Sequence, residues 1–401
     1  MDLNIKVSSD SRTIKPGEYF IPFKGENFDG SKFIKDALDK GAAGILQPEE
    51  LYELARKKLE QYKVKVIGIT GSVGKTTTKE ALATVLSGKY SVFSSPGNRN
   101  TLLGLSADIV NNLKKDHEIS VSEIAMDKPG EIAETCTYIK PDIGIITNIS
   151  GVHKEKLKTI ANIIKAKGEL LEFMDKDSVA FLNKDDKNVR KLEKTGKCKK
   201  IWFSTNTKHG YKTNLAGSHV DFVVTLIDEV CSHMGMSEKE IQKGLLKVRN
   251  SPGRMSKLEG KKGSIVLDDT YNASPASVKA GINYLRSFND KKKICILGDM
   301  LELGTGEIQA HESIIKYALK HSDKVILVGK KMRKAAKKIV NGATLNILDK
   351  SSDFDLNKHL DSDFLSKNAV FLVKGSRGIQ MENVVKKLLK NSKRDSEFLV
   401  G

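Results

Sequence analysis

The stretch VKVIGITGSVGKTTTKEALATVL, residues 64–86, decides the fold of this chain. It opens with a short β-branched run, residues 64–70, which is typical of a buried strand. The segment Gly71-Ser72-Val73-Gly74 follows, and a helical pattern begins directly after it at Lys75 and reaches Leu86. A strand, a glycine loop and a helix in this order bring backbone N–H groups and the positive end of a helix together. That arrangement is suited to phosphate groups.

The loop departs from the usual phosphate-loop spacing G-x-x-x-x-G-K-[ST], because the position of its first glycine holds Ile69. In the phosphate-binding interpretation, Lys75 reaches the terminal phosphates and the Thr76 hydroxyl binds magnesium. The alternative is a chance glycine turn in a Rossmann-like domain. Nucleotide binding alone does not distinguish a motor, a kinase and a ligase. The predicted ATP-binding residues of the loop are Gly71, Gly74, Lys75, Thr76 and Thr77.

Strands alternating with helices predict an α/β fold with doubly wound parallel sheets. Buried strands are expected at residues 120–125, 143–149 and 179–182, and a long helix at 159–173. The alternation restarts after Ser251-Pro252-Gly253 and predicts a Rossmann-like C-terminal part. The N-terminal part is a small α/β unit closed by a charged stretch, residues 49–63. The predicted domains are residues 1–63, 64–250 and 251–401.

The composition excludes several classes of protein. With 39% hydrophobic and 29% charged residues and 8 prolines, the chain is expected to be folded rather than disordered. No apolar run is long enough to cross a bilayer, and the opening MDLNIKVSSDSR lacks the layout of a signal peptide. A cytoplasmic protein without membrane insertion is therefore expected. The cysteines, which form no C-x-x-C pair and are predicted to be reduced thiols, are Cys136, Cys198, Cys231 and Cys295.

The net charge of +18 permits nucleic-acid binding as one interpretation. The lysines, however, are scattered in short groups, and only 6% of residues are aromatic. A lysine-rich genome or an anionic substrate explains the charge more simply, so no nucleic-acid partner is expected.

Polar residues that follow the next two predicted strands are candidates for a catalytic site beside the loop. Glu123 ends a buried strand, at the edge where an open α/β sheet presents its ligand-binding groups. Asn148 and His153 follow the next strand, and Lys167 lies on the helix after it. Singly, they also fit a solvated strand end, loop residues and a surface lysine. Together with the phosphate loop, an acid, a histidine and a lysine favour a catalytic site over a plain nucleotide hydrolase.

Four phrases resemble, in chain order, the central-domain signatures of the Mur ligase family: GITGSVGKTTTKE (68–80), SEIAMDKPGEI (122–132), TNISGVHKEKL (147–157) and IKAKGELL (164–171). The resemblance implies that Thr76 and Glu123 hold the magnesium ion that bridges the ATP phosphates. It implies that His153 helps to hold a second magnesium ion. It also implies that Lys167 is carbamylated by CO₂ and so becomes an anionic ligand of that ion. Lys165 is the competing candidate for this lysine.

Three C-terminal phrases resemble the branch of this family that adds D-Ala-D-Ala: DDTYNASPASVKAGINYL (268–285), LGDMLELG (297–304) and VKGSRG (373–378). The resemblance implies that Arg254 reaches the ATP phosphates and that Asn272 contacts the adenine. The phrase YNASP is also a competent turn and helix cap. The substrate-binding residues implied by the resemblance are Ser11, Arg12, Asn100, Thr101, Lys374 and Ser376.

The resemblance implies a three-domain, monomeric, ATP-dependent amide ligase with two magnesium ions. ATP would phosphorylate the terminal carboxylate of UDP-MurNAc-tripeptide, and the amine of D-Ala-D-Ala would attack the acyl phosphate. The catalytic residues would be Lys75, His153, Lys167 and Arg254. The phrase AMDKPGE and the segment 217–221 depart from the family pattern. The alternatives are a ligase of another branch or of the folylpolyglutamate type, a phosphate-loop ATPase or kinase, and a silent paralogue.

Overall fold

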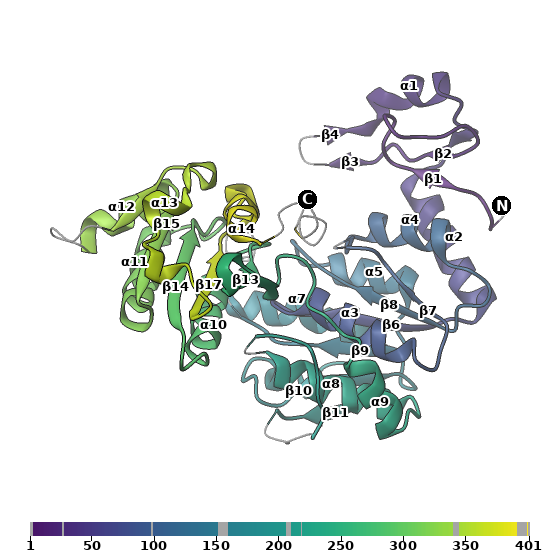
Figure 1. Cartoon of the computed structure of the whole chain (residues 1–401). Coiled ribbons are helices and arrows are strands. Elements are labelled where there is room, and N and C mark those ends of the chain that lie inside the picture. Colours follow the sequence, from purple (N-terminus) through teal and green to yellow (C-terminus); the bar gives the residue numbers. More distant parts are fainter. Residues whose placement is uncertain are drawn as a thin grey trace. The chain divides into compact units, whose positions relative to one another are not determined.

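The computed structural model describes residues 3–25, 28–97, 99–150, 159–205, 210–217, 219–339, 345–390 and 399. The chain divides into two compact units (Figure 1). The first contains residues 1–151, 156–212 and 222–247, and the second contains residues 152–155, 213–221 and 248–401. The predicted α/β class is confirmed, since each unit is built on a largely parallel sheet with helices.

The N-terminal part of the first unit holds a small parallel sheet and a hairpin. The sheet has the order β1-β2-β5, from Val7–Ser8, Tyr19–Phe20 and Gly44–Ile45. The hairpin pairs β3 (Lys24–Gly25) with β4 (Phe28–Asp29), and α1 (Ile34–Asp39) follows a 3-10 turn, Gly30–Phe33. The charged stretch after residue 48 forms the 15-residue helix α2, Pro48–Tyr62.

Helix α2 forms in the charged stretch because its apolar residues recur at helical spacing. Leu51, Leu54, Ala55 and Leu59 share its buried face, while Pro48 and a capping box between Gln47 and Glu50 begin the helix. Its apolar face shares one core cluster with the start of the central sheet and with α4, Leu102–Asn112. The N-terminal part and the central sheet are therefore joined by a common core.

The central sheet has six parallel strands among the described residues, in the order β11-β10-β9-β6-β8-β7. These strands are β6 (Lys65–Thr70), β7 (Val92–Ser94), β8 (Ile119–Glu123), β9 (Ile143–Ile146), β10 (Val179–Asn183) and β11 (Lys199–Phe203). The remaining helices are α3 (Lys75–Leu86), α5 (Glu131–Ile139), α7 (Ile160–Phe173), α8 (Val220–His233) and α9 (Glu238–Leu245). The expected strand-loop-helix at residues 64–86 and the helix near 159–173 are both present.

The order of the strands fixes where the carboxyl ends converge. From β6 the chain crosses by α3 to the edge strand β7, and it then returns through α4 and α5 to β8 and β9 on either side of β6. Right-handed crossovers therefore place α3 on one face and α4, α5 and α7 on the other. The carboxyl ends of β6, β8 and β9 lie side by side, which is where an open α/β sheet binds its ligands.

The second unit has a sheet in the order β12-β13-β17-β14-β15-β16, with only β12 antiparallel among the strands described there. Its strands are Ser256–Glu259, Ile265–Asp269, Ala369–Lys374, Lys292–Gly298, Lys324–Val328 and Asn346–Leu348, in sheet order. Its helices are α10 (Pro275–Arg286), α11 (Glu307–His321), α12 (Lys330–Ile339), α13 (Leu356–His359) and α14 (Glu382–Leu388). Alternate residues of β14 enter two different apolar clusters, so both faces of this sheet are covered.

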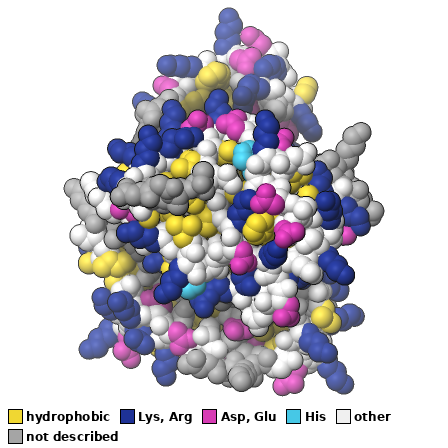
Figure 2. Space-filling model, turned by 60° about the vertical axis from the view of Figure 1, so that its left-hand side comes forward, with side chains coloured by type: hydrophobic (Ala, Val, Ile, Leu, Met, Phe, Trp, Pro, Cys, Tyr) yellow, Lys and Arg dark blue, Asp and Glu magenta, His cyan; other side chains and the backbone are white. Residues whose placement is uncertain are grey.

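The surface and the cysteines add two further observations. On the face shown in Figure 2, Lys and Arg side chains are spread out with Asp and Glu among them. The four cysteines are free thiols, and the structure places all four in buried positions. Within the described ranges, no helix combines the length and the apolar character that a membrane span requires.

The central position of β6 predicts a large effect of one core substitution. Ile67 on β6 is fully buried, so we expect Ile67→Ala to lower the unfolding free energy of the first unit by about 2–5 kcal/mol. Leu246→Ala is the control, because Leu246 is 45% exposed and its truncation is expected to cost less than about 0.5 kcal/mol. Urea unfolding followed by circular dichroism measures both variants. Equal losses in the two variants would contradict the placement of β6.

Candidate active site

The glycine loop connects β6 to α3 and has the backbone geometry that only glycine adopts easily. Gly71 has φ +149°, and Gly74, the N-cap of α3, has φ +85°. The Lys75 amino group donates a hydrogen bond to the Gly71 carbonyl at 3.1 Å. The first N–H groups of a helix have no acceptor within the helix, so the loop and the start of α3 provide donors for an anion.

The end of β9 holds this loop in place. Thr147 donates its hydroxyl proton to the Val73 carbonyl at 2.9 Å, and Asn148 accepts from the Val73 N–H at 3.1 Å. The Ser72 N–H donates to the Asn148 carbonyl at 2.9 Å. Asn148, which the sequence placed after this strand, is therefore bonded to the phosphate loop itself.

Glu123, at the end of β8, lies next to the start of α3. Its two carboxylate oxygens accept different donors, the Thr76 hydroxyl at 2.6 Å and the Asn100 amide at 2.9 Å. The Lys75 Nζ atom lies 3.8 Å from the second of these oxygens. Glu123 is buried, so these donors and the lysine compensate a carboxylate that is largely removed from water.

Lys167, on α7, reaches the same point from the other face of the sheet. Its side chain is almost fully buried, with 2% of its surface exposed, and its amino group donates to the Gly71 carbonyl at 3.0 Å. The pKa of Lys167 is lowered to about 7, mainly by burial and in part by the neighbouring Lys75, while Glu123 opposes the shift. A substantial fraction of this amine is therefore neutral, and hence nucleophilic, near pH 7.

The donor set around Glu123 fits a magnesium ion bound together with a nucleotide. Thr76 and Glu123 supply oxygen atoms, which magnesium prefers, and they already approach one another closely. No cluster of three His, Cys, Asp or Glu side chains that could hold a metal occurs in the part of the chain that the structure describes. A site with so few protein ligands is of the kind that magnesium completes with water and substrate phosphates.

Four of the predicted substrate-binding residues lie in two places in the first unit. Asn100 contacts Glu123, and the Thr101 hydroxyl caps α4 by accepting from the Gly104 N–H at 3.3 Å. Ser11 is buried and its carbonyl accepts from Lys40, whereas the Arg12 side chain is exposed. The Arg12 guanidinium bonds to Asp10 through two nitrogens, and these bonds lower the pKa of that carboxyl to about 2.

The second unit brings together the remaining predicted residues. The guanidinium carbon of Arg254 lies 4.0 Å from the centre of the Tyr271 ring, a cation–π contact. The Lys374 amino group bonds to the Asp269 carboxylate at 2.6 Å and to the Asn272 carbonyl at 2.9 Å. Lys374 thus fixes the main chain at Asn272.

Ser376 and Asp268 fix neighbouring loops of the second unit. The Ser376 hydroxyl accepts from the Leu301 N–H at 2.9 Å. Asp268 accepts from the Gly253 N–H at 3.1 Å, and burial raises the pKa of this carboxyl to about 6. The bond to Gly253 holds the loop that precedes Arg254.

Family models match most of the chain. The model described as Mur ligase family, catalytic domain, matches residues 6–86. Mur ligase middle domain matches residues 69–242, and Mur ligase, glutamate ligase domain, matches residues 253–377. A relative from Rickettsia prowazekii (strain Madrid E), named UDP-N-acetylmuramoyl-tripeptide–D-alanyl-D-alanine ligase, is 31% identical over 95% of this chain and 94% of its own length. The chain belongs to the Mur ligase family.

Two further proteins resemble this Mur ligase over nearly their whole length. The relative from Bacillus subtilis (strain 168) carries the same name as the Rickettsia protein and is 29% identical over 96% of this chain and 93% of its own. The crystal structure of MurF ligase from Thermotoga maritima in complex with ADP superimposes with a TM-score of 0.85. It is 27% identical and covers 98% of this chain and 99% of that one.

The structure unites five of the predicted residues of this Mur ligase around the phosphate loop: Gly71, Lys75, Thr76, Glu123 and Lys167. Asn100 joins them through Glu123. His153 lies outside the described residues. Lys165, the competing candidate, is exposed, whereas Lys167 is buried and bonded to the Gly71 carbonyl, so the geometry favours Lys167.

Sequence reasoning missed two side chains near this site. Asp186 accepts from the Ile149 N–H at 2.9 Å and steadies the chain after β9, and nothing in its sequence neighbourhood signals this role. Lys79 is fully buried on α3. Its spacing gave a signal, because it falls on the same helical stripe as the buried Leu82 and Leu86.

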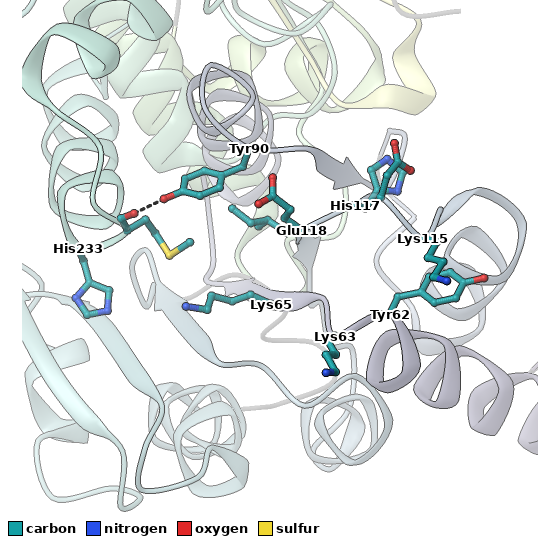
Figure 3. Close-up of a pocket in the computed structure, with 11 residues that line it drawn as sticks. Tyr62, Lys63, Lys65, Tyr90, Lys115, His117, Glu118 and His233 are labelled. Atoms are coloured by element: carbon teal, nitrogen blue, oxygen red, sulfur yellow. Dashed lines mark hydrogen bonds between the residues drawn. The ribbon is translucent and has the colours of Figure 1, made fainter.

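A hollow of about 480 Å³ lies at the opposite, amino-terminal edge of the central sheet (Figure 3). Its lining includes Lys65 at the start of β6 and residues 115–119 before and at the start of β8. The Tyr90 hydroxyl at its rim donates to the Met234 carbonyl. None of the predicted site residues lines this hollow, and its lysines are exposed side chains of an ordinary solvated kind. The hollow and the phosphate loop are thus at opposite ends of β6.

A comparison of two loop glycines tests the geometry of the phosphate loop. A Cβ atom at Gly71 would lie 1.9 Å from the Thr147 hydroxyl oxygen, whereas one at Gly74 would meet no atom within 4 Å. Gly71→Ala must therefore displace the loop, and we expect it to weaken ADP binding by at least about 100-fold. Gly74→Ala carries only backbone strain and should weaken it by about tenfold or less. Isothermal titration with Mg-ADP measures both, and similar affinities for the two variants would refute this packing.

Proposed function

We propose that this chain is the ATP-dependent ligase that joins D-Ala-D-Ala to UDP-MurNAc-tripeptide in the synthesis of peptidoglycan precursors. The single observation that carries the proposal is full-length similarity to relatives that bear this name, at 31% and 29% identity. The Thermotoga neighbour, a MurF ligase with bound ADP, supports nucleotide binding. The convergence of Lys75, Thr76, Glu123 and Lys167 on the loop after β6 supports an active enzyme rather than a silent paralogue.

The reaction has two steps, and the side chains around the phosphate loop suit the first. A carboxylate oxygen of the tripeptide attacks the γ-phosphorus of ATP, ADP leaves, and an acyl phosphate forms. Both reactants are anions, so the phosphate loop and Lys75 must hold the phosphates while the repulsion between reactants is offset. A magnesium ion held by Thr76 and Glu123 would supply positive charge to the phosphate oxygens.

In the second step, the free amine of D-Ala-D-Ala attacks the acyl carbon. The tetrahedral intermediate collapses, phosphate leaves, the amine loses a proton, and an amide remains. No nucleophilic side chain takes part. Arg254 and Asn272 are proposed from the family resemblance to contact ATP, and Lys374 would then position Asn272 by binding its carbonyl. Ser11, Arg12, Asn100, Thr101 and Ser376 are the remaining proposed substrate contacts.

We also propose that Lys167 is carbamylated. Carbamate formation joins a neutral lysine amine to CO₂ with loss of one proton, and it converts a cation into an anion. The buried position of Lys167, with a pKa of about 7, makes the neutral amine available. Its contact with the Gly71 carbonyl places the amine beside the phosphate loop. An anion there would face Lys75 and would suit a second magnesium ion, with His153 as a further proposed ligand. The protein is further proposed to act in the cytoplasm as a monomer.

Phosphate release tests the proposed function. We expect rapid release from ATP with UDP-MurNAc-tripeptide and D-Ala-D-Ala together, and little release when either is left out. An amide product of matching mass should form at the same rate. A separate assay with UDP-MurNAc-dipeptide and either lysine or diaminopimelate tests the alternative that the enzyme belongs to the branch that adds the third residue. Phosphate release that does not depend on D-Ala-D-Ala would refute the proposed ligase activity.

Substitution of Lys167 tests the carbamate separately. We expect Lys167→Ala to lose most activity, by at least about 100-fold, because a metal ligand is removed. Short carboxylic acids such as acetate should restore part of it by supplying an anion in the vacated space. Lys165→Ala is the matched control and should stay near the wild-type rate. Carbon-13 NMR of the wild-type protein in labelled bicarbonate should show a carbamate resonance that Lys167→Ala lacks. Full activity of that variant would remove Lys167 from the site.

A further inference from the structure

Lys79 is a buried lysine to which the reaction as described assigns no role. It lies on α3, four residues after Lys75, and only 1% of its surface is exposed. Its amino group donates hydrogen bonds to the Ser95 carbonyl at 2.5 Å and to the Gly97 carbonyl at 2.7 Å. Burying an amino group without such acceptors is costly, so these two bonds give the side chain a role in holding the main chain at Ser95 and Gly97.

Both acceptors belong to the segment that leads from β7 to α4 and contains Asn100. The described residues of this segment have further attachments. The exposed Arg99 side chain binds the buried Asp108 carboxylate at 2.9 Å. The Asn100 amide binds Glu123, and the Asn100 carbonyl accepts from the Ala125 N–H at 3.1 Å. Lys79 is the attachment that comes from the helix of the phosphate loop.

One helix therefore fixes two loops. At its first turn, α3 carries Lys75 and Thr76, which contact the Gly71 carbonyl and Glu123. One turn later, Lys79 holds the main chain at Ser95 and Gly97. Side chains four residues apart on a helix lie on the same side. The distance along α3 from its first turn to Lys79 is fixed. It therefore sets the spacing between the phosphate loop and the segment that contains Asn100.

We propose that Lys79 is a positioning residue for the UDP-linked substrate. It holds residues 95–97 so that Asn100 meets Glu123, and it acts on the binding of UDP-MurNAc-tripeptide rather than on the binding of ATP. The assignment of this substrate rests on the proposed function. The other part of the proposal, that Lys79 holds residues 95–97, rests only on the burial of Lys79 and the two hydrogen bonds described above.

A second buried lysine provides a matched control. Lys58 on α2 is 4% exposed, and its amino group donates to the Val110 carbonyl at 2.6 Å. It resembles Lys79 in burial and in its main-chain acceptor. Its acceptor, however, lies in helix α4 and not in a segment that carries a predicted site residue. A general effect of losing a buried lysine should appear in both Lys58→Met and Lys79→Met.

Steady-state kinetics on the full chain test the proposal. We expect Lys79→Met to raise KM for UDP-MurNAc-tripeptide by at least about tenfold, the effect of losing roughly one net hydrogen bond. KM for ATP should stay within about twofold, because the contacts of Lys75 and Thr76 are kept. Lys58→Met should change neither KM selectively. A parallel rise in both KM values for Lys79→Met, or no change in either, would overturn the proposal.

Two additional measurements keep the test decisive. If Lys79→Met does not fold, Lys79→Arg replaces it, because the guanidinium still donates but displaces residues 95–97. The KM for the UDP-linked substrate must again change more than that for ATP, and equal changes overturn the proposal. Hydrogen exchange of residues 95–101 should be faster in the Lys79 variant than in wild type and unchanged in Lys58→Met. Wild-type protein without ligase activity would refute the proposed function, and the exchange result would still decide whether Lys79 tethers the segment.

Discussion

The active site depends on Gly71, through the hydrogen bonds to its carbonyl and through the close packing at its Cα atom. The carbonyl accepts hydrogen bonds from Lys75 on one helix and from Lys167 on another. The Cα atom packs so closely against Thr147 that no side chain fits. Its φ of +149° is a further reason for glycine. This one residue therefore links β6, α3, α7 and the residues that follow β9.

The charges around this point have an uneven balance that suits anionic substrates. Lys75 and Lys167 both lie near a single buried carboxylate, that of Glu123. Burial lowers the pKa of Lys167 most, and repulsion by the second cation, Lys75, lowers it as well. The repulsion between the two cations can be relieved in two ways, by an added anion such as phosphate or by conversion of one amine to an anion. The proposed chemistry uses both, and this explains how a lysine can lie beside a metal site without opposing it.

Much of the fold could be predicted from the sequence, because the strands of both sheets are β-branched runs between clear loop signals. The strand-loop-helix at residues 64–86 and the phosphate-loop residues are present as expected. Helix α2 was harder, because its charged residues outnumber the apolar ones that form its buried stripe. Glu123, Asn100 and Lys167 could be named from the family resemblance. The contact of Asn100 with Glu123, and that of Lys167 with the Gly71 carbonyl, depend on the strand order, which no local pattern reveals. Lys374 shows the limit most clearly, since only the structure shows its bonds to Asp269 and the main chain of Asn272.

Glu123 gives the site a further property, because its two oxygens serve different parts of the molecule. One oxygen accepts from Thr76 of the nucleotide loop and the other from Asn100 of the segment after β7. Helix α3 makes the same connection a second time, through Thr76 and Lys79. The two loops are therefore linked both by a shared carboxylate and by a shared helix. A reaction in which a carboxylate attacks a phosphate requires its two reactants to be aligned within fractions of an ångström. Attachment of both loops to α3 and to Glu123 is a physical means of keeping that alignment.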